Sequence, residues 1–335
     1  MKLDTPFLWF TQTVNGVPRP WQFFKIDGLM LNAYEILKNE PLNNKVREKG
    51  VHEYFNFEGL IAIDSGGFLF MKKGVLDVSP EMVLKLYEES KPNFGVTLDY
   101  PLSPGLSYKV MKQRRLMTLE NIRHMLQLKQ SDNPELIPVI HGYSSNSIKW
   151  YLRQLEHIGT FNIYGIGSLV PSVFNTKDAG GIYNVVKIVR LIRKSLPNKI
   201  IHVFGVGSTL TMHIMFLAGA DSIDSSSWRT KAAFGAIQLP GIGDRYITPN
   251  KRHQKYTQLK NHEIKILEEC ECPACKKSSF EELKKSFTLR ALHNAWVFQK
   301  EIEKTRKLVK DNKYEEYATN VIRKTKYSKI INFLK

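Results

Sequence analysis

Short apolar segments that alternate with helical patterns constrain the fold of this chain most strongly. The apolar segments lie at 28–32, 60–64, 94–99, 136–141, 162–167, 199–205 and 219–224, and the helical patterns at 80–90, 108–129, 144–157, 178–195 and 210–218. Most of these segments are apolar throughout, as strands buried on both faces should be. Ser79 followed by Pro80 is a typical helix start. Strands that alternate with helices predict a parallel sheet, either open and doubly wound or closed as a barrel.

Polar residues or glycines at the ends of six apolar segments help to choose between these two folds. They are Asp64-Ser65-Gly66-Gly67, Asp99-Tyr100-Pro101, His141-Gly142, Gly167-Ser168, Gly205-Val206-Gly207 and Asp224-Ser225. In a (β/α)8 barrel the C-terminal ends of all strands converge on one mouth. An open sheet gathers only the residues near its switch point. The pattern therefore favours the barrel, although βα turns also use glycine simply for its positive φ.

Composition and charge limit the cellular context and the partners. The chain has 335 residues, a 42% hydrophobic content and a formal net charge of +17. No stretch approaches the roughly 18 apolar residues that span a bilayer, and the first residues do not form a signal peptide. We expect a cytoplasmic protein that does not contact membranes. The positive charge favours nucleic acid as a partner, although a lysine-rich genome would give the same excess.

All three cysteines lie in the segment CECPAC, as Cys270, Cys272 and Cys275. Three thiolates at this spacing hold a soft metal, and a tetrahedral zinc site needs a fourth ligand. His293, on a predicted helix, is the preferred fourth ligand, and His262, upstream in a polar loop, is the alternative. Free reduced thiols are the competing interpretation. An iron–sulfur radical cluster is disfavoured because its CxxxCxxC spacing is absent.

Several motifs together resemble the tRNA-guanine transglycosylase superfamily. They are DSGGF at a strand end, VSPEMVLKLYEES followed by VTLD, HVFGVGS, GADSIDSSSWRTKAAFG, and CxCxxC followed by LHN, in the order of that superfamily and over roughly residues 28–300. The resemblance implies a (β/α)8 barrel, a late zinc-binding insertion with a structural Zn²⁺, and a pentosyltransferase activity. That activity exchanges guanine in a nucleic acid for a 7-deazaguanine base.

The resemblance also assigns roles to two carboxylates. Breaking the glycosidic bond to guanine creates positive charge at C1′, which a carboxylate can attack to form a covalent intermediate. By resemblance that nucleophile is Asp224. A second carboxylate can take the proton of the incoming base, and this role matches Asp64.

Further residues are expected to bind the base or the polymer. Asp99 matches the aspartate that accepts hydrogen bonds from the guanine edge, unless it only initiates a turn. Ser168 and Leu169 match the segment whose amides face the base carbonyl, and Phe204 with Gly205 the segment that packs over the ring. Ser65, Gly167 and His141 are also expected to bind the base. Arg229 is expected to contact a phosphate or to orient the loop. Asp221 either braces the site or only caps a strand, and both interpretations stay open. Trp228 either stacks on an extruded base or sugar or simply packs.

Departures from the tRNA enzymes decide the expected polymer. His141 replaces a base-reading glutamine, SSSWR replaces Cys-x-x-Pro-Thr-Arg after the nucleophile, and the segment 276–292 between the metal ligands is short. These features look more like the DNA-acting DpdA-type branch of phages and bacterial modification islands, which inserts preQ0-like bases. DNA is therefore expected first, with tRNA as the alternative and a non-catalytic nucleic-acid-binding subunit as the second alternative. A phage-encoded protein would act in the host cytoplasm.

The predicted architecture is one α/β domain over residues 1–335. It contains a zinc-binding subdomain at 265–300 and a basic, helical C-terminal tail at 300–335, whose charges could equally form a solvated face. Dimers are common in the superfamily, so a homodimer is among the expected partners, but no residue pattern decides it.

Overall fold

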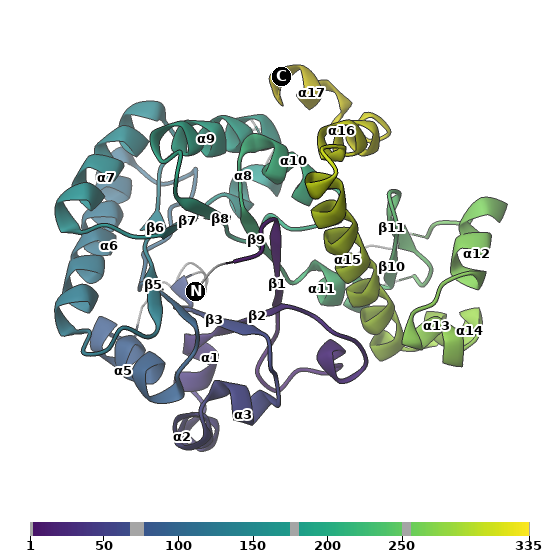
Figure 1. Cartoon of the computed structure of the whole chain (residues 1–335), viewed down its shortest axis with the longest axis horizontal. Coiled ribbons are helices and arrows are strands. Elements are labelled where there is room, and N and C mark those ends of the chain that lie inside the picture. Colours follow the sequence, from purple (N-terminus) through teal and green to yellow (C-terminus); the bar gives the residue numbers. More distant parts are fainter. Residues whose placement is uncertain (1–2, 68–76, 175–180, 250–255, 335) are drawn as a thin grey trace.

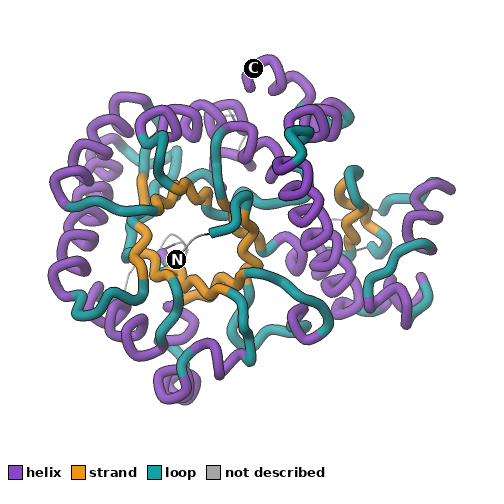
Figure 2. Tube along the Cα trace, viewed as in Figure 1, coloured by secondary structure: helices purple, strands orange, loops and turns teal. Residues whose placement is uncertain are grey.

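The fold was obtained as a computed structural model, which describes residues 3–67, 77–174, 181–249 and 256–334. Its centre is a ring of strands surrounded by helices (Figures 1 and 2). The strands of the ring are β1 (Phe7–Thr11), β2 (Gly28–Asn32), β3 (Leu60–Asp64), β4 (Phe94–Val96), β5 (Glu135–Ile137), β6 (Val139–Ile140), β7 (Ile163–Ile166), β8 (Ile200–Val203) and β9 (Ser222–Ser225). Their order is β5-β4-β3-β2-β1-β9-β8-β7-β6, and each pairing within it is parallel.

Pro138 explains why the ring contains nine assigned strands. It separates β5, which pairs with β4, from β6, which pairs with β7. Proline has no N–H group to donate to a neighbouring strand. Its carbonyl oxygen nevertheless accepts a hydrogen bond of 2.9 Å from the N–H of Gly165. The two pieces therefore act as one strand, which closes the ring as a (β/α)8 barrel, the predicted fold class.

The residues of each strand alternate between two hydrophobic layers. The layer inside the barrel contains Leu3, Phe7, Trp9, Met30, Ala62, Phe94, Val96, Ile137, Val139 and Ile163. Residues one position along, such as Leu8, Leu31 and Ile63, face the helices and join the large outer core. This alternation follows from the two-residue period of a strand. It fixes which residues at the strand ends point into the barrel mouth.

Helices follow most strands and cover the barrel. They are η1 (Pro20–Gln22), α1 (Ala33–Leu37), α2 (Glu40–Lys49), α3 (Val51–Phe55), α5 (Pro80–Ser90), α6 (Tyr108–Leu128), α7 (Ser145–Ile158), α8 (Val170–Phe174), α9 (Gly181–Ser195), α10 (Thr211–Ala218) and α11 (Ser227–Ala233). Ser79 caps α5 by accepting a hydrogen bond from the N–H of Met82. Ser144 caps α7 in the same way, through the N–H of Ser147. These caps explain why both helices begin next to a serine.

A smaller unit lies beside the barrel, and helix α15 (Phe287–Lys310) runs between the two (Figure 1). It contains an antiparallel hairpin, β10 (Ala236–Leu239) with β11 (Gly243–Tyr246), and the helices α12 (Asn261–Glu268), α13 (Pro273–Lys277) and α14 (Phe280–Lys285). After α15 the chain continues through α16 (Tyr314–Arg323), η2 (Ser328–Ile330) and α17 (Ile331–Leu334). The C-terminal region is thus helical, as predicted. Residue 300, where we divided subdomain from tail, falls inside α15.

The observed elements differ from the predicted ones in a few places. No strand was predicted at β1 or in the β10–β11 hairpin, and the strand predicted at 94–99 ends at Val96. The last predicted barrel strand, 219–224, begins only at Ser222 because Gly219 has a φ of 109° and ends α10. The start of the helix predicted at 178–195 lies outside the described residues.

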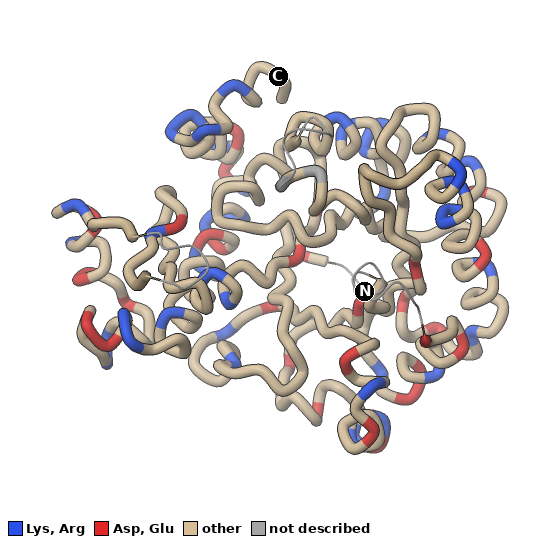
Figure 3. The backbone as a smooth tube through the Cα atoms, turned by 180° about the vertical axis from the view of Figure 1, so that it is seen from behind, with Lys and Arg blue, Asp and Glu red and all other residues tan. Residues whose placement is uncertain are grey.

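Lys and Arg lie on helices all around the barrel and on the C-terminal elements, interspersed with Asp and Glu (Figure 3). Opposite charges are close enough to pair at several of these sites, for example Lys38 with Asp77 at 2.6 Å. Of the helices that the structure describes, none combines the length and the apolar character that a bilayer crossing requires.

Candidate active site and metal centre

Four adjacent strands of the barrel end in polar residues that point into its mouth. Thr11 ends β1, Asn32 ends β2 and Asp64 ends β3, and Asp224 is the last residue but one of β9. These strands are neighbours in the order β9-β1-β2-β3. The register places Asn32 directly beside Asp64. Thr11, Asn32 and Asp64 each have the same strand parity as an inward-facing apolar residue of their own strand, such as Trp9 for Thr11. Asp224 is paired directly with the inward-facing Trp9 of the neighbouring strand. The two aspartates that we singled out are therefore brought to one mouth.

Both carboxylate oxygens of Asp224 accept hydrogen bonds from the protein. The N–H of Gly205 donates to Oδ1 at 2.6 Å, and the Thr11 hydroxyl donates to Oδ2 at 2.9 Å. His202 lies beneath, with Nε2 3.5 Å from Oδ1 of Asp224 and Nδ1 2.8 Å from the Ser222 hydroxyl. Asp224 is only 8% exposed. Hydrogen bonds to both oxygens fix the orientation of the carboxylate.

Asp64 has a very different electrostatic environment. Burial among protein atoms, the largest cause, and the charges of Asp99 and Asp224 together raise its pKa from 3.8 to about 8. Hydrogen bonds from the backbone N–H groups of Gly66, at 3.2 Å, and of Ser65 oppose this shift only in part. Asn32 Nδ2 also donates to the carboxylate at 3.4 Å. Three carboxylates that share one site cannot all ionise at low cost. At neutral pH the Asp64 carboxyl therefore holds a proton in the free protein.

Asp99 and His141 form the opposite wall of the mouth. Nε2 of His141 lies 2.9 Å from Oδ2 of Asp99, and the Ser65 hydroxyl donates to Oδ1 of Asp99 at 3.3 Å. On its other side, Nδ1 of His141 lies 2.8 Å from the Ser168 hydroxyl, which accepts the N–H of Leu102 at 2.7 Å. The Ser168 hydroxyl hydrogen is thus available to Nδ1. This arrangement leaves a proton on Nε2, facing Asp99.

The segment 167–169 approaches this wall very closely. A Cβ atom at Gly167 would lie 2.6 Å from Cε1 of His141, and one at Gly67 would lie 2.1 Å from Oδ1 of Asp99. Ser168 has a φ of 65°, a left-handed conformation that is uncommon outside glycine. The Tyr143 hydroxyl lies 2.9 Å from the Ser168 carbonyl oxygen and 3.0 Å from that of Leu102, which helps to hold this conformation.

Phe204, Gly205 and Leu169 have distinct positions around the mouth. Phe204 is partly buried against the layer inside the barrel, and its ring lies edge-on to His202, with 4.4 Å between centroids. Gly205 has a φ of 70°, which allows its N–H to reach Asp224. Leu169 is fully buried, and its side chain packs in the outer core instead of facing the mouth.

Arg229, Trp228 and Asp221 are held away from the carboxylates. Arg229 donates to the Thr13 hydroxyl and lies 5.6 Å from the Phe287 ring centroid. Trp228 is fully buried and packs in the outer core, which answers the open question in favour of packing.

Asp221 lies at the opposite end of β9. Its carboxylate pairs with Arg193 and accepts the N–H of Ile201 at 2.7 Å. Asp221 therefore ties β9 to β8 and α9 at the N-terminal end of the strand, instead of bracing the mouth.

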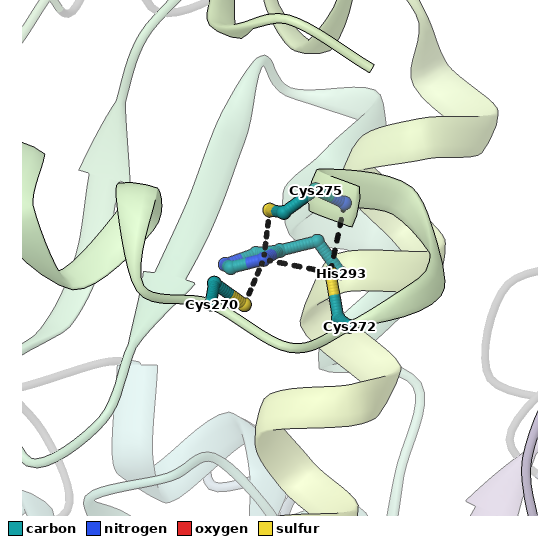
Figure 4. A group of neighbouring side chains, drawn as sticks. All are labelled: Cys270, Cys272, Cys275 and His293. Carbon is teal, nitrogen blue, oxygen red and sulfur yellow. Dashed lines mark hydrogen bonds between the residues drawn. The ribbon is translucent and has the colours of Figure 1, made fainter. Parts of the chain in front are cut away.

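Cys270, Cys272, Cys275 and His293 form one compact group (Figure 4). Nδ1 of His293 lies 3.6 Å from the sulfur of Cys270, 3.5 Å from that of Cys272 and 3.3 Å from that of Cys275. A tetrahedral zinc ion with usual Zn–S and Zn–N bond lengths requires S···N separations of about 3.6 Å. The geometry therefore fits a zinc ion bound by these four side chains. His262 is exposed on α12 and does not belong to the group.

The local structure explains how the four ligands converge. Cys272 is the N-cap of α13, and its sulfur accepts the N–H of Cys275 at 3.2 Å. His293 comes from the first turns of α15, and its Nε2 lies 2.9 Å from the carbonyl oxygen of Gln238 in the hairpin. A hydrogen bond of this kind fixes the histidine tautomer and leaves Nδ1 free to bind the metal.

The residue after His293 connects the metal centre to the barrel. Asn294 donates to the carbonyl oxygens of Trp228 at 3.0 Å and Ala236 at 3.1 Å, and accepts the N–H of Gln238 at 2.7 Å. Trp228 belongs to α11, which follows the strand of Asp224 almost directly. One turn of α15 thus contacts both the hairpin and the helix after the proposed nucleophile.

Our sequence analysis did not single out Thr11, Asn32, His202 or Tyr143. Thr11 and Asn32 end apolar runs, FLWFT and GLMLN, so they have the same signature as Asp64. His202 stands inside a strand, two residues before Phe204, and only its inward parity shows that it faces Asp224. Tyr143 had no signal of its own.

Comparison with known proteins relates this sequence to one family. The sequence model of the queuine tRNA-ribosyltransferase family matches residues 1–327. The tRNA-guanine(15) transglycosylase of Pyrococcus furiosus is 28% identical over 308 residues, which cover 88% of this chain and 47% of the relative. The protein of the same name from Pyrococcus abyssi is 26% identical over 300 residues, with the same two shares. That from Methanopyrus kandleri is 26% identical over 312 residues, covering 91% and 63%.

This chain spans about half the length of the two Pyrococcus relatives that it matches. The family match, in contrast, extends over nearly the whole of this chain, from the first residue through α16. It includes the strand ends that form the mouth and the four residues of the metal centre. The chain belongs to the queuine tRNA-ribosyltransferase family.

Proposed function

We propose that the protein is a transglycosylase that replaces guanine in a nucleic acid by a 7-deazaguanine base. The observation that carries this proposal is the contrast between two carboxylates at one mouth. Asp224 accepts hydrogen bonds at both oxygens, whereas the pKa of Asp64 is raised to about 8. Two acidic groups with such different environments suit a nucleophile and a proton donor in the same reaction.

In the first step, a carboxylate oxygen of Asp224 attacks C1′ of the target nucleotide. The C1′–N9 bond breaks, and its electron pair stays on the departing guanine. The protonated Asp64 donates its proton to that base, which then leaves as neutral guanine. A covalent bond joins Asp224 to C1′. The N–H of Gly205 and the Thr11 hydroxyl keep the carboxylate oriented for this attack.

In the second step, the incoming 7-deazaguanine base occupies the position that guanine has left. The ionised Asp64 removes the proton from its ring nitrogen while that nitrogen attacks C1′. The bond between C1′ and Asp224 breaks, and the carboxylate is restored. Asp64 regains the proton that it gave up, so one cycle consumes no net proton. Two displacements at the same carbon retain the β configuration.

Asp99 and His141 are proposed to read the base. The Asp99 carboxylate accepts hydrogen bonds from the amino and ring N–H groups of the guanine edge. Nε2 of His141 lies 2.9 Å from Oδ2 of Asp99 without a hydrogen bond among the described residues, and the imidazole packs against the carboxylate. Gly167, Ser65 and the backbone at Ser168 surround this edge, and Phe204 provides an apolar surface for the ring. The target nucleotide must leave its base stack to reach this mouth.

The polymer is proposed to be tRNA, since the three relatives above are named for tRNA. This reverses the order that we expected from the sequence, in which DNA was first. DNA stays the second candidate because His141 occupies the position of a base-reading glutamine and SSSWR follows the nucleophile strand. Contacts to the ribose 2′-hydroxyl would separate the two polymers. The DpdA-type assignment, preQ0 as the incoming base and a homodimer remain predictions.

The metal centre is proposed to hold a structural Zn²⁺. All four ligand positions are filled by protein side chains, which leaves no open position for a substrate. The ion would join CECPAC to α15 and thereby stabilise the contact between α15 and the helix after Asp224.

A guanine-release assay tests the function directly. Purified protein is incubated with tRNA or duplex DNA that carries labelled guanine, each with and without preQ0, and released label is counted. We expect release from tRNA that becomes irreversible when preQ0 is present, and none with Asp224→Asn. Preferential release from DNA would support the second candidate. A folded protein that binds nucleic acid but releases no label from either polymer would favour the non-catalytic subunit.

A further inference from the structure

A cavity of about 460 Å³ lies between the first turns of α6 and α7. Tyr108, Lys112 and Arg115 of α6 line it on one side, and Asn146, Ser147 and Trp150 of α7 on the other, together with the N-cap Ser144. Among the described residues that line this cavity, two are cations and none is a carboxylate. The reaction proposed above uses none of them. The cavity therefore has the charge of an anion-binding site.

Arg115 is the most unusual group in this cavity. The residue is only 5% exposed, and its Nε has no hydrogen-bond acceptor among the described residues. Its guanidinium lies 5.8 Å from the ring centroid of Trp150. Arginine stays protonated at neutral pH, so this is a buried cation without a paired anion. Such a group is costly to bury unless a ligand supplies the missing acceptors.

The start of α7 adds a second favourable element. The helix has 14 residues, and its N-terminal end, at Ser144 to Ser147, borders the cavity. The N–H of Ser147 is already bound by the cap, and those of Ser145 and Asn146 precede it in the first turn. The partial positive charge of a helix N-terminus and N–H groups without an intrahelical acceptor favour phosphate. A guanidinium, a hydroxyl, a lysine and a helix N-terminus around one cavity are the usual ligands of a phosphate group.

The position of the cavity connects it to the mouth of the barrel. Asp99 lies in the loop that leads into α6, and His141 in the loop that leads into α7. Arg114, the neighbour of Arg115, donates to the carbonyl oxygen of Pro101 at 2.6 Å and so holds the first of these loops. A polymer whose target base enters the mouth would have its neighbouring nucleotides near these helix ends.

We propose that this cavity binds a backbone phosphate of the nucleic-acid substrate, a short distance from the exchanged nucleotide. Arg115 donates to the phosphate oxygens, with Lys112 and the start of α7 completing the site. Trp150 and the exposed Tyr108 contact the adjoining sugar or base. This inference rests on the proposed function, because it takes the polymer that enters the mouth to be a nucleic acid.

Two variants and one control test it. Arg115→Gln removes the buried cation. Asn146→Asp places a negative charge in the exposed second position of α7, where an acidic residue favours the helix, so this variant should fold even if Arg115→Gln does not. Arg123→Gln is the control, since Arg123 is exposed farther along α6 and pairs with Glu120. It removes the same unit of charge outside the cavity.

Dissociation constants are measured for labelled tRNA and DNA over a range of salt concentrations, by fluorescence anisotropy. Both cavity variants should weaken binding about ten-fold and lower the magnitude of the salt slope by about one, whereas Arg123→Gln should change the slope much less. Melting temperatures report folding. If folded Asn146→Asp shows the same salt dependence of polymer binding as Arg123→Gln, the proposal is overturned.

A second arm uses inorganic phosphate and a guanosine monophosphate instead of the polymer, with binding followed by NMR of the Trp150 indole. One outcome would assign the cavity to a free phosphate and overturn the proposal. In it, inorganic phosphate or guanosine monophosphate binds in a way that depends on Arg115, while both variants bind the polymer as tightly as the wild type. Guanine release by the wild type is measured in parallel. If the wild type releases no guanine while polymer binding still depends on the cavity residues, the proposed function is refuted and the phosphate site is not.

Discussion

His141 Nε2 lies 2.9 Å from Asp99 Oδ2, and this pair connects two loops that are 42 positions apart in the chain. The Ser168 hydroxyl on the other side of the ring sets the tautomer, so that Nε2 carries the hydrogen. The ring of His141 thus packs against one oxygen of Asp99, although Nε2 makes no hydrogen bond to the described residues. This contact limits the orientations of the Asp99 side chain before any base arrives, which reduces the entropy lost on binding.

Replacement of His141 should separate this positioning role from simple packing. His141→Leu replaces the polar neighbour of a buried carboxylate by an apolar side chain and should lower kcat/KM for the incoming base about 10- to 100-fold, the cost of leaving a buried charged group without a polar partner. His141→Gln should lose far less, because its amide keeps a polar group beside Asp99. Steady-state base incorporation measures both. Equal losses in the two variants would show that the polar contact with Asp99 is not what His141 contributes.

Replacement of Asp224 should remove the covalent step. Asp224→Asn should lower base exchange by at least about 10³-fold, as expected for loss of a nucleophile, and should abolish the adduct seen on a denaturing gel. Polymer binding should stay within a few-fold of the wild type. Asp221→Asn is the matched control, because Asp221 lies at the other end of the same strand, paired with Arg193. It should retain exchange, and an active Asp224→Asn would refute the assignment.

The raised pKa of Asp64 makes a prediction about stability. In the folded protein this pKa is about 8, against 3.8 for a free aspartate. Ionisation is therefore easier after unfolding, and the free energy of unfolding falls as pH rises from about 4 to 8. Asp64→Asn cannot ionise, so at pH 8 it should be more stable than the wild type, by on the order of 2–5 kcal/mol.

Denaturant unfolding of both proteins at pH 5, 6, 7 and 8 measures this difference. It should grow steadily with pH and level off above about pH 8. The same variant should lose most base exchange, because asparagine neither donates the proton to guanine nor accepts one from the incoming base. A stability difference that does not depend on pH would contradict the raised pKa, whatever the activity.

Replacement of a cysteine should release the metal and destabilise the smaller unit beside the barrel. Cys272 is fully buried, and Cys272→Ala should reduce the zinc content from about one ion per chain to near zero. The melting temperature should also fall. Elemental analysis and thermal unfolding measure these two effects. His262→Gln is the control, and it should keep its zinc because His262 is exposed outside the group. Zinc retained by Cys272→Ala would exclude this site.

The barrel was predictable because most of its strands are continuous apolar runs. The strands at 28–32 and 60–64 and the helix at 80–90 match the structure residue for residue. β1 was missed because its five residues follow Pro6 directly and carry no turn signal, and only its pairing with β2 and β9 defines it. The hairpin was also missed. Its two strands pair only with each other, and this pairing defines them.

The site was predictable where chemistry coincides with a strand end. The carboxylates at 64, 99 and 224 stood out as charges after apolar runs. Thr11 and Asn32 did not, because a neutral polar residue at a strand end is common in any turn. The contact of His202 with Asp224 depends on which face of β8 points inward, and the cavity at Arg115 depends on the packing of two helices. Neither can be read from local sequence.

Helix α15 has a further consequence through His293 and Asn294, which are adjacent in sequence. His293 belongs to the metal centre, Asn294 binds α11, and both contact Gln238 of the hairpin. Zinc starvation, or oxidation of the three thiols, would therefore disturb the packing that supports α11. No group in the barrel mouth would be altered directly. Metal supply and catalytic geometry would then be coupled through a single turn of helix.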